Sequence, residues 1–166
     1  MKHTLTALVL GVALLLASGG SGYAQDFQKG LEAARKGDFA TALREWRPLA
    51  EQGDAKAQHY LAWLFQEGRG VTKKYKEAAK WYRKSAEQGY AWSQKELGWM
   101  YYRGQGVLKD VVYTHMWFNI AASSGDPLAA DAGGWRDLIA KEMTTEQLAE
   151  AQKLARECVR KKYKGC

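Results

Sequence analysis

Histidine is the residue of this chain that could most readily act as a general base or a metal ligand. Beyond the first residues the sequence holds His59 and His115, and neither has a carboxylate or cysteine spaced with it as a ligand set. The motifs of serine hydrolases and zinc proteases are absent, and Gly68 with Gly70 lacks the rest of a phosphate-binding loop. We therefore expect both histidines to be surface or packing residues, with no catalytic site, metal or cofactor.

The two cysteines, Cys158 and Cys166, lie within the last nine residues. In an exported protein, where thiols can be oxidised, an intrachain disulfide is their natural pairing. Closing so short a loop would stabilise the fold by about 2.5 kcal/mol on a chain-entropy estimate. The spacing is not the CxxC of redox-active pairs, and a metal site would need more ligands. We expect the disulfide to hold the C-terminus onto the last helix.

The N-terminus has the pattern of a secretory signal peptide. Lys2 precedes an apolar run over 5–17, and Gly22-Tyr23-Ala24 supplies small residues before a cut. The run is too short to cross a bilayer comfortably. We expect cleavage after Ala24 and a periplasmic or secreted protein, with residues 25–166 forming a single domain.

The rest of the sequence is helical in character, with no alternating strand pattern. Apolar residues recur at helical spacing in segments that glycines and polar turns separate. The predicted helices cover 27–36, 39–52, 55–67, 75–88, 91–103, 111–124, 128–141 and 145–163. Thr144 and Gln147 form a capping box for the last of them. Helices of this length are marginal alone in water, so neighbouring hairpins must stack to bury their apolar stripes.

The segment 55–90 is repeated without a gap as 91–126. The copies match at small, aromatic and turn positions, among them Leu61/Leu97, Trp63/Trp99, Gly68/Gly104, Gly70/Gly106, Val71/Val107, Trp81/Trp117 and Gly89/Gly125. Self-similarity at this period is typical of a helical repeat array. The register fails after 126, where 127–166 supplies final helices and a cap.

These residues resemble the Sel1-like repeat, a relative of the tetratricopeptide repeat. The resemblance rests on Leu61-Ala62, Gly68-Arg69-Gly70-Val71, Trp81-Tyr82 and their counterparts in the second copy. The segment 27–54 lacks the Gly-x-Gly-Val loop and is more similar to the shorter tetratricopeptide form. The resemblance implies an all-α fold, a short α-solenoid of stacked antiparallel helix hairpins closed by a C-terminal capping helix.

In such repeats the first helix of each hairpin lines a concave groove. The matching outward positions are Lys56, His59, Trp63, Gln66, Trp92, Lys95, Trp99 and Tyr102. Aromatic and cationic residues are favoured at binding hot spots, so these positions are the predicted partner-binding set. The alternative is that Trp63 and Trp99 pack between hairpins. Because shared positions serve packing and turns, residues that differ between copies, such as His59 and Lys95, would select the partner.

The leading functional prediction is a non-enzymatic adaptor that grips a protein or peptide in the bacterial cell envelope. One alternative is an envelope enzyme of the β-lactamase or penicillin-binding type. Relatives associated with penicillin carry a cysteine pair in every repeat, whereas this chain has none between Ala24 and Cys158.

Without the signal peptide, 24 basic and 18 acidic residues leave a charge of +6. A second alternative is therefore binding of peptidoglycan or an anionic surface by the basic segment 156–164; an exported protein rarely meets nucleic acid.

Overall fold

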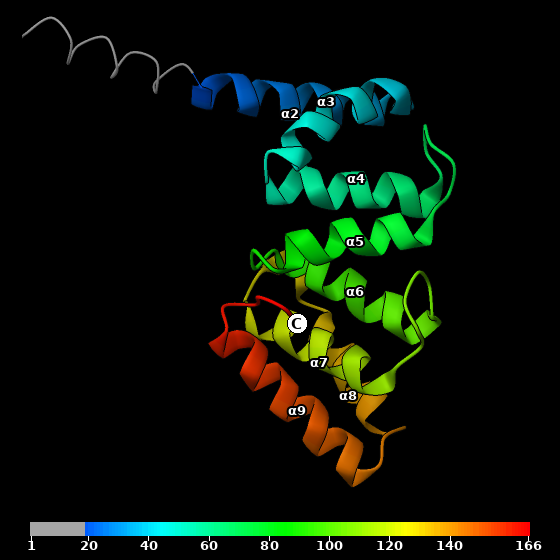
Figure 1. Ribbon diagram of the computed structural model, residues 1–166, viewed down its shortest axis with the longest axis vertical. Coiled ribbons are helices and arrows are strands. Elements are labelled where there is room, and N and C mark those ends of the chain that lie inside the picture. Colours follow the sequence, from blue (N-terminus) through cyan, green and yellow to red (C-terminus); the bar gives the residue numbers. More distant parts are fainter. Residues whose placement is uncertain (1–18) are drawn as a thin grey trace, which may run out of the picture.

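The computed structural model describes residues 19–166, and within them it holds helices and no strand. In chain order these are α2 (Gly19–Arg35), α3 (Phe39–Glu51), α4 (Ala55–Glu67), α5 (Tyr75–Ala86), α6 (Ala91–Arg103), α7 (Val111–Ser123), the 3-10 turn η1 (Pro127–Ala129), α8 (Ala132–Ala140) and α9 (Thr145–Arg160). Helices α2 to α7 form three stacked hairpins, and α8 and α9 both pack on α7 (Figure 1). The predicted all-α solenoid is confirmed.

Two element boundaries differ from the sequence prediction. Helix α2 begins at Gly19 rather than at 27, so the predicted cleavage point after Ala24 falls inside this helix. Residues 1–18 of the predicted signal peptide lie outside the described part. The helix predicted over 128–141 is divided into η1 and α8. Asp126 Oδ1 accepts a hydrogen bond from the Leu128 N–H at 2.8 Å, which starts a tight turn separate from the helix that follows.

Side-chain caps fix the starts of α3, α4, α7 and α9. Asp38, Asp54 and Asp110 accept hydrogen bonds from backbone N–H groups in the first turns of α3, α4 and α7. The predicted capping box is confirmed: Thr144 Oγ1 accepts from the Gln147 N–H at 3.2 Å, and Gln147 Oε1 accepts from the Thr144 N–H at 3.0 Å. Such caps satisfy backbone donors that the helix itself leaves free. In residues 19–166, no helix is long and apolar enough to cross a membrane.

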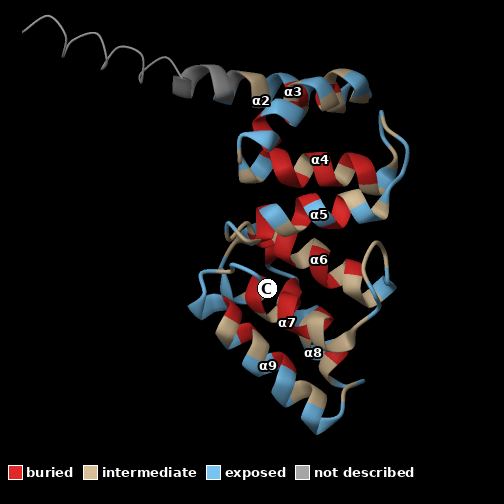
Figure 2. Ribbon diagram, in the orientation of Figure 1, coloured by how far each residue is buried: buried red, intermediate tan, exposed pale blue. Residues whose placement is uncertain are grey.

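Buried residues lie where the helices face one another, and exposed residues lie on the outside (Figure 2). The main cluster runs from α2 to α9 and includes Trp46, Tyr82 and Trp117, each at most 1% exposed. A smaller cluster surrounds Phe118 and joins α6 and α7 to the η1–α8 segment. Full burial of a large apolar side chain contributes roughly 1.5–3 kcal/mol, so this core holds the stack together.

The second glycine of each Gly-x-Gly-Val loop touches the hairpin before it. Gly70 and Gly106 have φ angles of 67° and 73°, a region that residues with a side chain rarely adopt. A Cβ at Gly70 would lie 2.8 Å from the Phe39 carbonyl oxygen, and one at Gly106 would overlap the Tyr75 carbonyl. Phe39 and Tyr75 are the first residues of α3 and α5. Each loop therefore docks by its backbone on the second helix of the preceding hairpin.

The C-terminal tail folds back onto the stack. The structure joins Cys158 in α9 to Cys166, with their Cα atoms 5.6 Å apart. Between them the chain reverses through Lys162 and Tyr163, whose φ angles are 52° and 66°. The Tyr163 ring lies over Gly89, at the end of the α4–α5 hairpin. The disulfide thus closes a loop that places an aromatic ring on the main core.

We predict that Gly106→Ala lowers the free energy of unfolding more than Gly125→Ala does. Both glycines have φ near 70°, but an added Cβ at Gly125 meets nothing within 4 Å. The backbone strain of about 1–2 kcal/mol is therefore common to both variants. The clash with Tyr75 adds a further penalty of about 1–3 kcal/mol to Gly106→Ala alone. Urea unfolding measures the difference; equal losses would show that the loop contact does not support the stack.

We predict that Cys158→Ser and Cys166→Ser each lower the free energy of unfolding by about 2.5 kcal/mol. The double variant should lose no more than either single variant, because all three break one bond. Denaturant unfolding with and without dithiothreitol provides the check, since reduction of the wild-type protein should reproduce the loss. An unchanged midpoint on reduction would contradict the role given to the disulfide.

Candidate functional site

A groove of about 450 Å³ crosses the first helices of the three hairpins. Its lining comes from α2, α4 and α6, with one tryptophan from α3: Leu31, Ala34, Arg35, Trp46, His59, Tyr60, Trp63 and Trp92. A volume of this size is within the range of sites that hold small ligands or several side chains of a partner. Most of the lining thus comes from the first helices of the hairpins, where the sequence analysis expected a groove.

Aromatic rings make up most of the groove's walls. The ring centroid of Tyr60 lies 4.8 Å from that of Trp46 and 6.1 Å from that of Trp92. Trp92 also packs against His59, with the centroids 4.4 Å apart and the ring planes tilted by 33°. Trp63 meets the edge of Phe39 at 5.8 Å, in the second helix of the first hairpin. Rings packed on one another lose little freedom when they contact a partner, which favours binding.

A buried chain of hydrogen bonds fixes the orientation of His59. The Ser85 hydroxyl donates to the Ala55 carbonyl oxygen at 2.7 Å, and the Ser93 hydroxyl donates to Ser85 Oγ at 2.7 Å. Ser93 Oγ is thereby left to accept from His59 Nδ1–H, at 2.9 Å. Because Nδ1 donates, His59 orients its ring through Ser93 and does not act as a base toward it. In the described part of the chain, no protein group hydrogen-bonds the other ring nitrogen, Nε2.

Burial keeps the groove's titratable rings neutral. His59 is 3% exposed, and burial, with a smaller contribution from the charge of Lys95, lowers its pKa to about 3. Its imidazole is therefore uncharged at neutral pH, and Nε2 is a hydrogen-bond acceptor. Burial also raises the pKa of Tyr60, against the opposing charge of Arg35, so its phenol stays protonated. Arg35, which is exposed, supplies the positive charge of the lining.

Three of the eight predicted partner-binding residues, His59, Trp63 and Trp92, line this groove. His59 was predicted at an outward position, but its ring is only 3% exposed at the wall of the groove, where Nδ1 lies 2.9 Å from Ser93 Oγ of the next hairpin. Lys56 is exposed and Gln66 is half-buried, and neither lines the groove.

The other three predicted residues, Lys95, Trp99 and Tyr102, lie under the C-terminal segment or beside it. Lys95 Nζ lies 2.9 Å from Asp131 Oδ1, and it donates to the Leu128 carbonyl oxygen at 3.1 Å. Trp99 packs edge to face against Trp135 of α8, and it makes a second edge-to-face contact with Tyr102. Part of α6 that was predicted to face a partner is therefore covered by η1 and α8. Trp63 and Trp99 share a repeat position but have different surroundings.

Sequence reasoning missed the contribution of the first hairpin. Leu31, Ala34 and Arg35 lie at i, i+3 and i+4 on α2, the spacing of one helix face, and this signal was available. Tyr60 was missed because the second copy has Glu96 at that position, so the repeat does not mark it. Among residues 19–166, no group of three or more histidine, cysteine or acidic side chains is placed to hold a metal ion.

Stacked helix hairpins with a groove along their first helices define an α-solenoid scaffold. The Sel1 repeat family model matches residues 55–90 and 93–126. The chain thus contains two Sel1 repeats, as the sequence resemblance predicted. Sel1 repeats generally form helical scaffolds for protein–protein interaction rather than enzymes.

Two solved structures are similar to this chain. One is c5321, a protective antigen present in uropathogenic Escherichia coli strains displaying an SLR fold: it has 29% identity and a TM-score of 0.78, covering 85% of this chain and 31% of its own. The other is a Sel1 repeat protein from Oxalobacter formigenes, with 36% identity and a TM-score of 0.55, covering 58% of this chain and 28% of its own. The chain thus spans less than a third of either solved chain. No curated protein matches it.

We predict that His59 stays neutral in the folded protein down to about pH 4, with the proton on Nδ1, because its pKa is about 3. The unfolded chain takes up this proton near pH 6.5. The contribution of neutral His59 to the free energy of unfolding is therefore fully present above pH 6.5 and is lost as the pH falls toward 3.

Imidazole ¹⁵N shifts and urea unfolding across this range measure both effects. In His59→Asn, whose amide can still donate to Ser93, the fall in stability with acid should be smaller. A folded-state His59 that titrates near pH 6.5 would contradict the assignment.

Proposed function

We propose that this protein is an exported adaptor whose aromatic groove holds a segment of a partner protein in the bacterial cell envelope. The observation that carries the proposal is the groove itself. Three hairpins contribute rings to one concave surface, which fits the use of Sel1 repeats as interaction scaffolds. Buried aromatic anchors of this kind supply much of the energy of protein interfaces.

The lining also limits the chemistry of the bound segment. Apolar side chains would fill the space between Tyr60, Trp63 and Trp92, where they lose contact with water. An N–H or O–H group of the partner would donate to Nε2 of His59, which is a fixed acceptor. A carboxylate would meet Arg35 at the exposed edge. The expected ligand is an apolar segment that carries an acidic residue at one end.

Two features support an export route. The segment 1–24 has the pattern of a signal peptide, and the Cys158–Cys166 disulfide is typical of oxidising compartments. The periplasm, or the space outside the cell, is therefore the proposed location. We therefore expect the partner to lie in the same compartment, and it should be sought by experiments on the intact cell envelope.

Photocrosslinking from defined positions identifies the partner. A photoreactive phenylalanine analogue at position 63 faces the groove, and the same analogue at position 102 lies outside it. Crosslinking in intact cells, followed by mass spectrometry, should give a discrete product at 63 that is absent at 102. The peptide that carries the crosslink then defines the segment for binding measurements.

We predict that Trp92→Ala weakens binding of that segment by at least about tenfold, as expected for an aromatic hot spot. Tyr102→Ala is the matched control, because this half-buried ring on the same helix lies outside the groove. Its affinity should stay within about twofold, well below the loss of a hot-spot ring. Isothermal titration calorimetry on variants of unchanged helicity makes the comparison. Equal losses, or no loss at Trp92, would overturn the groove assignment.

A further inference from the structure

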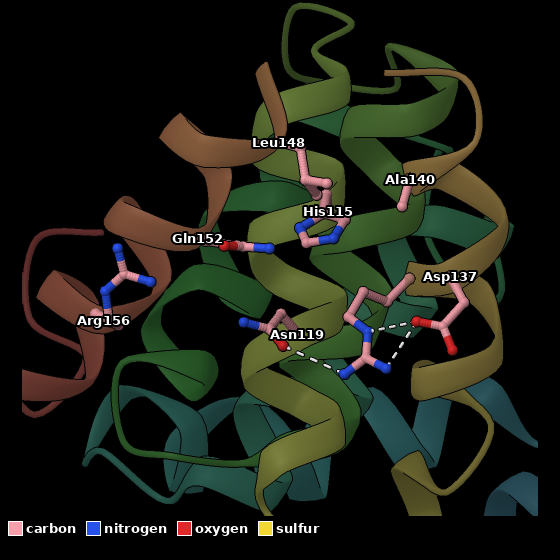
Figure 3. A pocket seen from close by; sticks show the side chains of 8 residues that line it. His115, Asn119, Asp137, Ala140, Leu148, Gln152 and Arg156 are labelled. Atoms are coloured by element: carbon pink, nitrogen blue, oxygen red, sulfur yellow. Dashed lines mark hydrogen bonds and ion pairs between the residues drawn. The ribbon is translucent and has the colours of Figure 1, made fainter. Parts of the chain in front are cut away.

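A second hollow lies at the opposite end of the molecule, between α7, α8 and α9. Its volume is about 460 Å³, and six of its eight lining residues have polar side chains, whereas the aromatic groove is lined mostly by rings. Figure 3 shows His115 and Asn119 of α7 facing Gln152 of α9, with Asp137 of α8 on the other side. None of these residues contributes to the groove of the first three hairpins.

His115 gives the first sign that this hollow receives a ligand. The residue is 3% exposed and lines the hollow, yet its Nδ1 is buried without a hydrogen-bond partner in the described part of the chain. Burial, and then the charge of Arg136, lowers the pKa of His115, against the opposing charge of Asp137. The ring is therefore neutral near pH 7. An unpaired polar atom at such a depth is costly, and a bound group could satisfy it.

One wall of the hollow contains an ion pair. Arg136 Nε donates to Asp137 Oδ1 at 2.8 Å, and Arg136 Nη1 donates to Asn119 Oδ1 at 3.4 Å (Figure 3). The charge of Arg136 is thus balanced by its neighbour. Because the oxygen of Asn119 accepts from Arg136, its amide N–H₂ remains as a donor.

The opposite wall carries a second cation. Arg156 of α9 is exposed, and it has no ion pair within residues 19–166. Gln152 lies one helical turn before it and adds an amide that can donate. The lining therefore offers one net positive charge with neutral donors around it. That balance favours a monoanion, and a guanidinium matches the geometry of a carboxylate.

An apolar extension continues from this point. A neighbouring hollow of about 340 Å³ shares Asn119 and Arg156 with the first and is otherwise lined mainly by Ile120, Ala155 and Val159. Val159 is 46% exposed, so its side chain is open to contact with a bound group. Arg156 stands where the polar and apolar parts meet.

We propose that the α7–α9 hollow binds a carboxylate borne on a short branched apolar group. The carboxylate lies between Arg156 and the amides of Asn119 and Gln152, within reach of His115. The apolar group lies against Ile120 and Val159. Such a ligand is either the C-terminus of a peptide that ends in an aliphatic residue or a free short-chain acid.

The test uses two acids and their neutral counterparts. The probes are 4-methylpentanoate and N-acetyl-glycyl-leucine, each paired with its primary amide, titrated into the full chain and followed by the His115 imidazole signals. Both acids, or one of them, should give a saturable shift, and the corresponding amide should bind at least about tenfold more weakly. The acid that binds more tightly identifies the source as a peptide end or a free acid.

Arg156→Gln should weaken acid binding at least about tenfold, since a hydrogen bond to a charged group is lost. Arg160→Gln removes the same charge one turn further along α9, outside the hollow, and should leave the affinity within about twofold, as expected for a remote exposed charge. Both side chains are exposed, so neither change should unfold the protein. The proposal is overturned if no saturable shift appears by about 10 mM probe, if amides bind as well as acids, or if the two variants lose affinity equally.

Discussion

The contact on which the stack depends is the approach of one loop's backbone to the start of a helix in the hairpin before it. At Gly70 and Gly106 a side chain would collide with the carbonyl groups of Phe39 and Tyr75. This contact sets how closely successive hairpins approach, and it is repeated once per repeat. At this spacing Tyr60 of the second hairpin contacts both Trp46 of the first and Trp92 of the third. The aromatic groove is therefore a consequence of the same geometry that builds the core.

The two ends of the solenoid have different surfaces. At the N-terminal end the groove is open across three first helices, and its buried His59 faces the groove with a neutral ring. Toward the C-terminus η1 and α8 cover the equivalent face of α6, through Lys95 and Trp99. A surface ion pair such as Lys95 with Asp131 contributes little energy by itself, about 0–1 kcal/mol, so the aromatic packing holds this cover in place. The C-terminal segment ends the array, and a hollow remains between the last helices.

Much of the fold followed from local patterns. The bounds predicted for 55–67 and 91–103 are those of α4 and α6, because each helix ends at a glycine in the left-handed conformation and is set by its repeat position. The surroundings of Lys95 and Trp99 could not be predicted from the repeat, because their partners lie after residue 126, where the repeat register fails. The burial of His59 could not be predicted either. Its hydrogen-bond partner Ser93 is 34 residues away in sequence, and histidine occurs at both buried and exposed helix positions. Local signals predict elements and turns, whereas the placement of a polar side chain depends on partners that stacking brings near.

The central claim is that the groove across α2, α4 and α6 is the surface that holds a partner. The chain contains seven tryptophans, and their indole N–H signals report on different parts of the stack. Titration of the crosslinked partner segment into ¹⁵N-labelled protein tests the claim most directly. The account predicts shifts for Trp46, Trp63 and Trp92, with little change at Trp117 and Trp135. Shifts confined to Trp99 and Trp135, with the groove signals unmoved, would contradict it.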